Sequence, residues 1–174
     1  MKYVLDILEE TGLLGSKPVK TPMEPNVKLY EYQEELLSNP KTYCRLIGKL
    51  NYLTITRPNI SFVVSVLSQF MKDPRLPHWE AVIQIVRYLK AYPGRGLLYK
   101  TNGHLQVEAY TDANWAGSPS DRKSTNRYCT ILGGNLITWR SKKQTVVAKS
   151  SAKAEYRAMA HASCELMWIK HLFT

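Results

Sequence analysis

Two carboxylates, Asp112 and Glu155, are the residues of this 174-residue chain whose positions could support chemistry. Residues 105–112 alternate apolar and polar side chains, which predicts a strand that ends at Asp112. Glu155 follows Ser150, the predicted N-cap of a long helix. If that helix packs across the sheet, the two carboxylates share a site, and a hard divalent cation would relieve their repulsion. The alternative is that Asp112 caps a turn and Glu155 complements the helix dipole.

Seven basic residues flank these carboxylates in the sequence and predict contacts with the phosphates of a nucleic acid. Trp115 and Trp139 lie among them, and this mixture suits phosphates and sugars, although either tryptophan could instead belong to the core. The net charge is +10, and residues 105–174 hold ten Lys and Arg against five Asp and Glu. A solvated basic surface without a ligand is the alternative interpretation. The seven residues are Arg122, Lys123, Arg140, Lys142, Lys143, Lys149 and Arg157.

The composition indicates a folded protein of the cell interior. Hydrophobic residues make up 44% of the chain, which is enough for a core, and no apolar run reaches the roughly 18 residues of a membrane span. The N-terminus lacks the apolar stretch of a signal peptide. We therefore expect an intracellular protein, cytoplasmic or nuclear, that is not secreted and contacts no membrane. Three scattered cysteines and four scattered histidines predict neither a disulfide framework nor a zinc site.

Hydrophobic periodicity divides the chain into a helical part and a mixed part. Amphipathic helices are expected over residues 2–12, 40–57, 59–73 and 79–92, separated by breaks that contain Pro or Gly. Strands are expected at 97–99 and 105–112, a hairpin at 128–132 and 136–139, and a long helix at 152–172. The predicted fold class is α+β, with one domain over residues 1–92, a boundary at 93–104 and a second domain over 105–174.

Four motifs of the mixed part closely resemble, in this order, the ribonuclease H region of copia-type LTR retrotransposon polyproteins. They are YTDANWAG at residues 110–117, DRKST at 121–125, GGNLITWRSKKQ at 133–144 and AKSSAKAEYRA at 148–158. Upstream, LIGKLNYL at 46–53, TRPNIS at 56–61 and HWEA at 78–81 resemble the segment that follows the reverse transcriptase palm in the same polyproteins. The resemblance covers nearly the whole chain.

The resemblance implies a helical, connection- or thumb-like segment of a reverse transcriptase, followed by a truncated ribonuclease H-like α/β domain of strand, hairpin and long helix. It implies that Asp112 and Glu155 are catalytic residues and ligands of two Mg²⁺ ions. Enzymes of this kind cleave the RNA strand of an RNA·DNA hybrid by two-metal hydrolysis, in which one ion activates water and the other stabilises the leaving oxygen. The rest of the Pol polyprotein is the implied protein partner.

Departures from the family pattern predict little or no nuclease activity for this chain alone. The family has a further aspartate on a strand beyond the long helix, and this sequence ends before such a motif. Lys153 and Asn114 stand where acids are usual, and Asn126 and Arg127 stand where a small residue and a glycine are usual. Two carboxylates would hold Mg²⁺ weakly, because this ion demands near-octahedral geometry. The alternative function is non-catalytic, as a degenerate remnant or as a fragment that binds nucleic acid or a protein partner.

Overall fold

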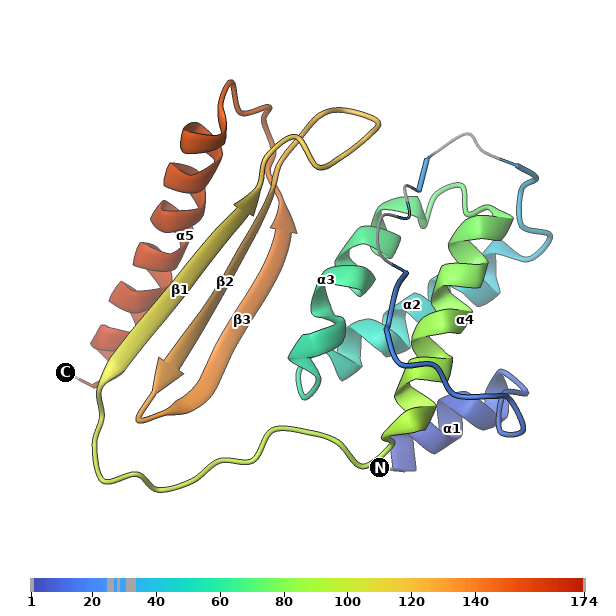
Figure 1. Cartoon of the computed structure of the whole chain (residues 1–174), viewed down its shortest axis with the longest axis horizontal. Helices are drawn as coiled ribbons and strands as arrows, with labels where there is room; N and C mark the ends of the chain where they lie inside the picture. The colour runs from blue at the N-terminus through green and yellow to red at the C-terminus, as the bar shows by residue number, and fades with distance from the viewer. Residues whose placement is uncertain (1, 25–26, 28, 31–33, 174) are drawn as a thin grey trace. The chain divides into compact units, whose positions relative to one another are not determined.

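The computed structural model describes residues 2–24, 27, 29–30 and 34–173, and it divides the chain into two compact units (Figure 1). Residues 1–96 form the helical unit, and residues 97–174 form the sheet unit. The fold class is α+β, as the sequence predicts. None of the helices in the described part of the chain is long and apolar enough to cross a membrane.

The helical unit contains α1 (Lys2–Glu10), α2 (Pro40–Leu53), α3 (Pro58–Leu67), the short 3₁₀ helix η1 (Ser68–Phe70) and α4 (Leu76–Ala91). A proline in the first turn of α2, α3 and α4 helps to set where each begins, because the first turn needs no backbone N–H donor there. The predicted helices are confirmed, but three end earlier than predicted: α1 at Glu10 and not at residue 12, α2 at Leu53 and not at 57, and α3 with η1 at Phe70 and not at 73. Their apolar stripes pack into one core, which includes Ile7, Leu8, Tyr43, Ile47, Leu50, Ile60, Val64, Leu67, Ile85 and Leu89.

One histidine is buried beside this core, and its hydrogen bonds define the tautomer of the neutral ring. His78 is 1% exposed, and its ring stacks on Phe70 with 3.8 Å between the ring centroids. The backbone N–H of Arg75 lies 3.1 Å from His78 Nδ1, and the carbonyl oxygen of Tyr30 lies 3.0 Å from Nε2. Because the amide can only donate and the carbonyl can only accept, the neutral ring carries its proton on Nε2.

The sheet unit contains β1 (Val107–Asn114), β2 (Thr125–Leu132), β3 (Asn135–Lys143) and α5 (Ser151–Leu172). Over the residues that the structure describes, the strands form one antiparallel sheet in the order β1-β2-β3. Gly133 and Gly134 connect β2 to β3 with φ angles of 54° and 73°, which glycine adopts without strain. The predicted hairpin and long helix are therefore confirmed.

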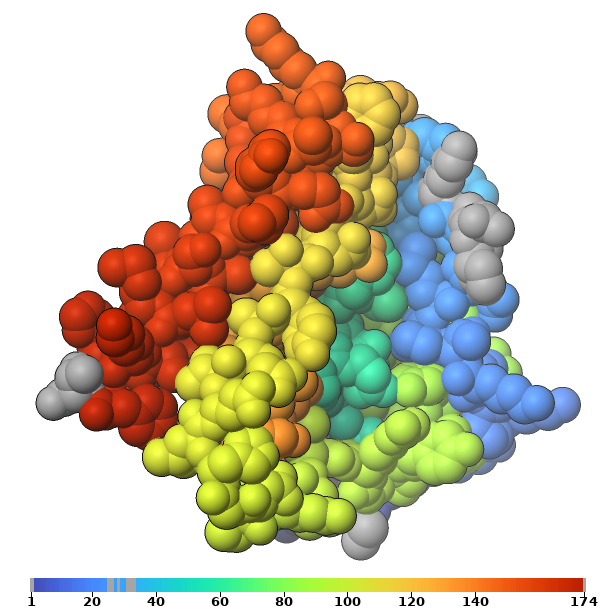
Figure 2. All heavy atoms as spheres, turned by 60° about the vertical axis from the view of Figure 1, so that its left-hand side comes forward, coloured from blue at the N-terminus to red at the C-terminus, as the bar shows by residue number. Residues whose placement is uncertain are grey.

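Helix α5 covers one face of the sheet, along β1 and β2 (Figure 1). Ala154, Ala158 and Ala162 recur every four residues and are buried, so small side chains line the contact with the strands. The outer side of α5 lies at the surface of its unit, where Figure 2 shows the helix in red. Tyr156 and Trp168 on that side are 71% and 55% exposed.

Two details of the strand prediction are wrong. Residues 97–99 form no strand: Leu98 is 78% exposed, and no described strand pairs with this segment. The backbone N–H and carbonyl of the next residue, Lys100, instead form two hydrogen bonds of 2.8 Å with the side chain of Asn135. Asp112 does not end its strand, because β1 continues to Asn114 and its last two residues pair with the start of β2.

Candidate functional site

Asp112 lies on the face of the sheet that points away from α5. It is paired in register with Arg127 of β2, and its Oδ2 lies 3.4 Å from Arg127 Nη1. The neighbours of Arg127 point to the helix side: Asn126 is buried, and Tyr128 donates to a carboxylate of α5 at 3.2 Å. Because alternate residues of a strand face opposite sides, Arg127 and Asp112 share the other face. The Asp112 side chain is 61% exposed there.

Glu155 reaches the same strand from the helix side. Ser150 caps α5 by accepting a hydrogen bond from the amide of Lys153 at 3.2 Å, which fixes the first turn. One turn into the helix, Glu155 Oε1 accepts a hydrogen bond from the amide of Ala113 at 3.2 Å. The structure therefore brings Glu155 to the residue next to Asp112, but it places the two side chains on different sides of β1.

This arrangement does not fit a site for two Mg²⁺ ions. The Asp112 carboxylate contacts a guanidinium and the Glu155 carboxylate contacts a backbone amide, so each already has a partner. Among the described residues, no group of three or more His, Cys, Asp or Glu side chains is placed to hold a metal ion. Magnesium takes oxygen ligands in near-octahedral geometry, and these two carboxylates alone supply too few ligands for two ions.

Two of the seven predicted basic residues share one acid as an ion-pair partner. Lys123 Nζ lies 3.3 Å and Lys143 Nζ lies 2.9 Å from the carboxylate of Asp121. Burial alone would raise the pKa of Asp121, but hydrogen bonds from Ser118 and Lys143 hold that pKa well below its usual range. Asp121 therefore stays ionised, and the two lysines offer less free charge than the sequence suggests. Arg122, between Asp121 and Lys123 in the sequence, is exposed and has a positive φ of 56°.

The remaining cations include an exposed pair on β3. Arg140 and Lys142 are paired in register with Tyr128 and Asn126, so they stand on the face of the sheet that α5 occupies. Both are exposed because α5 covers β1 and β2 rather than β3. Beside them, Arg157 of α5 donates hydrogen bonds to the connection between β3 and α5 at 3.3 and 3.4 Å. Three of the predicted basic residues therefore gather along one side of the helix.

The tryptophans and the last predicted cation lie elsewhere in the unit. Trp115 is 47% exposed, and its indole N–H donates to the carbonyl of Ala148 at 3.0 Å. Lys149 follows Ala148 in the sequence and is exposed. Trp139 is half-buried and is paired in register with Cys129, on the face away from α5. Trp139 therefore lies on β3 but on the opposite face of the sheet from Arg140 and Lys142.

Sequence reasoning missed Gln144, a buried residue that connects the sheet to α5. Its side-chain amide donates to the side chain of Asn126 and, at 3.1 Å, to the carbonyl of Ala154. Its side-chain oxygen accepts from Arg157 at 3.3 Å. No periodic pattern identifies such a residue, because its role depends on where the helix returns to the sheet. Gln144 holds α5, and with it Glu155, in place.

Comparison with known proteins finds relatives among transposon polyproteins. The chain is 45% identical over 173 residues to the retrovirus-related Pol polyprotein from transposon RE1 of Arabidopsis thaliana, a match that covers 99% of this chain and 12% of that protein. An uncharacterised mitochondrial protein of the same plant is 38% identical over 96% of this chain and 69% of that protein. A secreted RxLR effector protein of Plasmopara viticola is 41% identical over 73% of this chain and 90% of that protein. No family model and no solved structure matches the chain.

The match to the transposon polyprotein extends over both units, and the chain spans 12% of that relative's length. This extent agrees with the motifs in both halves of the sequence, so the resemblance is confirmed. Over nearly its whole length the chain is similar to one part of the copia-type retrovirus-related Pol polyproteins of transposons, and the matches do not specify which part.

Proposed function

We propose that the sheet unit is the ribonuclease H-related part of a Pol polyprotein and that it binds an RNA·DNA hybrid without cleaving it by itself. The observation that carries this proposal is the exposed basic face of β3, where Arg140 and Lys142 stand beside α5. A hybrid presents two phosphate backbones, and each Lys or Arg that contacts a phosphate releases counterions. We place this action inside the cell, in the cytoplasm or the nucleus.

In this proposal the helical unit is the connection- or thumb-like segment of the reverse transcriptase. The motif at residues 46–53 lies in α2, and the motif at 56–61 spans the start of α3. Both motifs resemble the segment that follows the polymerase palm. The rest of a Pol polyprotein is the protein partner that the relatives suggest.

The placement of the acids supports binding rather than cleavage. Two-metal hydrolysis needs carboxylates that hold two ions about 3.5–4 Å apart. Asp112 is instead paired with Arg127, and Glu155 lies on the other side of β1. We therefore expect weak or no Mg²⁺ binding by this chain, and we assign neither carboxylate a chemical step.

A second candidate function is the binding of a protein partner at the C-terminal end of α5. Leu105, Val107, Leu166, Lys170 and Phe173 line a cavity of about 420 Å³ there. Leu105 is 71% exposed and Phe173 is 58% exposed. Exposed apolar side chains around a hollow are typical of protein contacts, so this surface favours a partner such as the rest of the polyprotein.

A gel-shift titration with a short labelled RNA·DNA hybrid tests the binding surface. The double variant Arg140→Gln/Lys142→Gln is expected to weaken binding and to reduce the slope of log K against log salt by roughly two, one for each lost phosphate contact. The matched control is Lys41→Gln/Lys72→Gln, which removes the same charge from exposed positions of the helical unit. Equal losses in both variants would contradict a binding face on β3, and so would binding that does not change with salt.

The same samples test the claim that the chain does not cleave. Incubation with Mg²⁺ is expected to leave the labelled RNA strand intact. Cleavage that requires Mg²⁺ and disappears in Asp112→Asn would overturn this part of the proposal and would restore Asp112 as a metal ligand. Cleavage that persists in Asp112→Asn would point to a contaminating nuclease and would leave Asp112 without a catalytic role.

A further inference from the structure

β1 forms one edge of the sheet, and most of its outer side is open (Figure 1). The carbonyl oxygen of Gln106 accepts a hydrogen bond from the N–H of Gly133 at 2.9 Å, so the backbone groups of Gln106 point to the β2 side. Because these groups alternate in direction along an antiparallel strand, those of Val107, Ala109 and Thr111 point away from β2. Over the residues that the structure describes, no hydrogen bond reaches these outward groups. They can therefore bond to another strand.

Glu155 closes the far end of this edge. Ala113 belongs to the same outward set, and its N–H already donates to Glu155 Oε1 at 3.2 Å. A strand added to β1 would therefore bond to residues 107–111. The sequence of β1 does not prevent this, because it contains no Lys or Pro, the residues that often protect natural edges. The strand at the other edge, β3, carries Arg140, Lys142 and Lys143.

The flank of α5 above this edge carries opposite charges at its two ends. Glu155 lies on this flank, because it contacts Ala113, and Met159 follows one turn later with 52% exposure. Lys170, near the end of α5, lines a hollow together with Val107, the first residue of β1. Helix and strand therefore run antiparallel, with an acid near the end of β1 and a cation near its start. Figure 2 shows β1 in yellow beside α5 in red.

A second copy of the chain is complementary to this surface. A two-fold axis makes the two β1 strands antiparallel, so the start of one meets the end of the other. With Ala109 opposite Ala109 of the second copy, Val107 would stand opposite Thr111, and every outward N–H and C=O of these residues would have a partner. Lys170 of each copy would then lie about two residues, roughly 7 Å, along the strand from Glu155 of the other copy, which a lysine side chain can span.

The helices fit the same arrangement. Neighbouring strands of a sheet are about 4.8 Å apart, and α5 lies over β1 and β2. The two α5 axes would therefore be roughly 10 Å apart, which is close to the distance of about 8–10 Å at which helices pack. The exposed side chain of Met159 would lie between the helices, where its burial favours association.

We propose that this chain forms a two-fold dimer through β1, in which the sheet continues from one copy into the other and the two α5 helices pack on the same face. The dimer does not rest on the proposed binding of an RNA·DNA hybrid, because β3 lies at the opposite edge of the sheet. It leaves the basic face of β3 at both outer edges of the joined sheet. The dimer therefore presents this face twice.

Sedimentation equilibrium of the full chain over a range of concentrations tests the dimer. The mass is expected to rise from 19.9 kDa to twice that value and no further. Ala109→Pro removes the N–H at the centre of the pair, and with it two hydrogen bonds per dimer, so it is expected to raise the dissociation constant roughly 5- to 100-fold. The fold is expected to be retained, because this N–H points away from β2 and proline is tolerated at such edge positions. A circular dichroism melt checks the fold of the variant.

Lys170→Glu tests the charge pairing without changing β1. It sets two acids against each other across the dimer and is expected to raise the dissociation constant roughly 2- to 10-fold. The matched control is Lys153→Glu, which makes the same change at an exposed position of α5. Lys153 lies two residues before Glu155, about 200° around the helix, and therefore points away from the flank above β1. Equal effects of the two variants would mean that net charge alone governs association and would contradict the proposed arrangement.

Amide hydrogen exchange locates the interface without any substitution. The amides of Val107, Ala109 and Thr111 are expected to exchange quickly in dilute protein and slowly in concentrated protein. Those of Glu108 and Tyr110 face β2 and are expected to stay protected at both concentrations. This alternation along one strand distinguishes pairing at the β1 edge from association through the outer side of α5.

Three outcomes would overturn the proposal. A mass that stays at 19.9 kDa up to about 1 mM protein would exclude the dimer. A dimer that leaves the three outward amides unprotected would assign association to another surface. Species larger than a dimer would mean that unlike surfaces meet, because a two-fold pair closes on itself. The double variant Arg140→Gln/Lys142→Gln is expected to dimerise normally, so a failure of hybrid binding leaves this test intact.

Discussion

Acidification below about pH 6.5 is expected to destabilise the helical unit through His78. The ring is 1% exposed, and both of its nitrogens already have defined partners. A second proton would have to sit on Nδ1, which faces the backbone N–H of Arg75 at 3.1 Å. Protonation therefore replaces an acceptor by a donor that points at another donor, beside the stacked ring of Phe70.

The direction of the pKa shift sets the pH range in which stability is lost, and the binding of one proton sets the maximum slope of that loss. Burial lowers the pKa of His78, the hydrogen bond to the Tyr30 carbonyl opposes that shift, and the charge of Arg75 adds to it. In the unfolded chain the pKa is near 6.5, so the unfolded state binds the proton first as the pH falls. The contribution to stability is fully present above pH ~6.5. Below it, the free energy of unfolding falls by at most about 1.4 kcal/mol per pH unit until the folded-state pKa is reached.

Urea unfolding followed by circular dichroism at about pH 7.5, 6.5 and 5.5 measures this loss. The control variant is His78→Gln, whose amide can donate to Tyr30 and accept from Arg75 without titrating. Histidines 104, 161 and 171 are exposed and are common to both proteins, so they cancel in the difference. Wild type is expected to lose more stability than the variant between pH 6.5 and 5.5. Equal losses in the two proteins would refute the assignment of this acid sensitivity to His78.

Three further substitutions test the packing and the site. Gln144→Leu is expected to lower the free energy of unfolding of the sheet unit by about 2–4 kcal/mol, because the buried Asn126 loses its partner; tryptophan fluorescence during urea unfolding measures this, and a loss below 1 kcal/mol would argue against the connecting role of Gln144. Tyr43→Phe removes one buried hydroxyl hydrogen bond of 2.8 Å and is expected to cost about 1–2 kcal/mol, seen as a lower urea midpoint that an unchanged midpoint would contradict. Asp112→Asn breaks an exposed ion pair with Arg127 and is expected to change stability by less than about 1 kcal/mol, and a larger loss would mean that the pair contributes to packing.

The helices and the hairpin could be predicted because local chemistry determines them. Proline at the start of α2, α3 and α4 and apolar residues at helical spacing act within a few residues of each other. Gly133 and Gly134 similarly fix the turn between β2 and β3. Residues 97–99 show the limit of this reasoning. Their apolar character is typical of a strand, but a strand also needs a neighbour, and only the folded sheet decides whether one is present.

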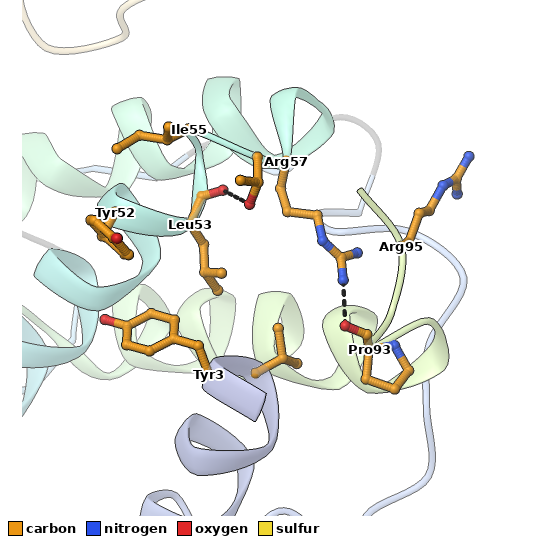
Figure 3. A pocket seen from close by; sticks show the side chains of 9 residues that line it. Tyr3, Tyr52, Leu53, Ile55, Arg57, Pro93 and Arg95 are labelled. Atoms are coloured by element: carbon orange, nitrogen blue, oxygen red, sulfur yellow. Dashed lines mark hydrogen bonds between the residues drawn. The ribbon is translucent and has the colours of Figure 1, made fainter. Parts of the chain in front are cut away.

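The site was harder to predict because it depends on contacts between distant residues. The positions of Asp112 and Glu155 on β1 and α5 follow from sequence, but the faces they occupy depend on the register of β1 and β2. The connection over residues 115–124 sets that register, and its length alone does not reveal it. Arg57 illustrates the same limit. In the sequence it is one cation before a proline, and only the packing of α4 against it shows that it is buried, with a hydrogen bond to the carbonyl of Pro93 after that helix (Figure 3).

Residues 126 and 127 of β2 depart from the family pattern, and the structure shows what these departures change. The pattern has small residues there, whereas this chain has Asn126 opposite Ala113 and Arg127 opposite Asp112. Asn126 points to the helix side and bonds with Gln144, which connects to α5. Arg127 points to the other face and pairs with Asp112. A small residue at 127 would offer Asp112 no cation. Two adjacent substitutions therefore act on both faces of one strand: one helps to fix the helix that carries the second acid, and the other neutralises the first. This is why the arrangement of the acids argues against metal-dependent cleavage by Asp112 and Glu155.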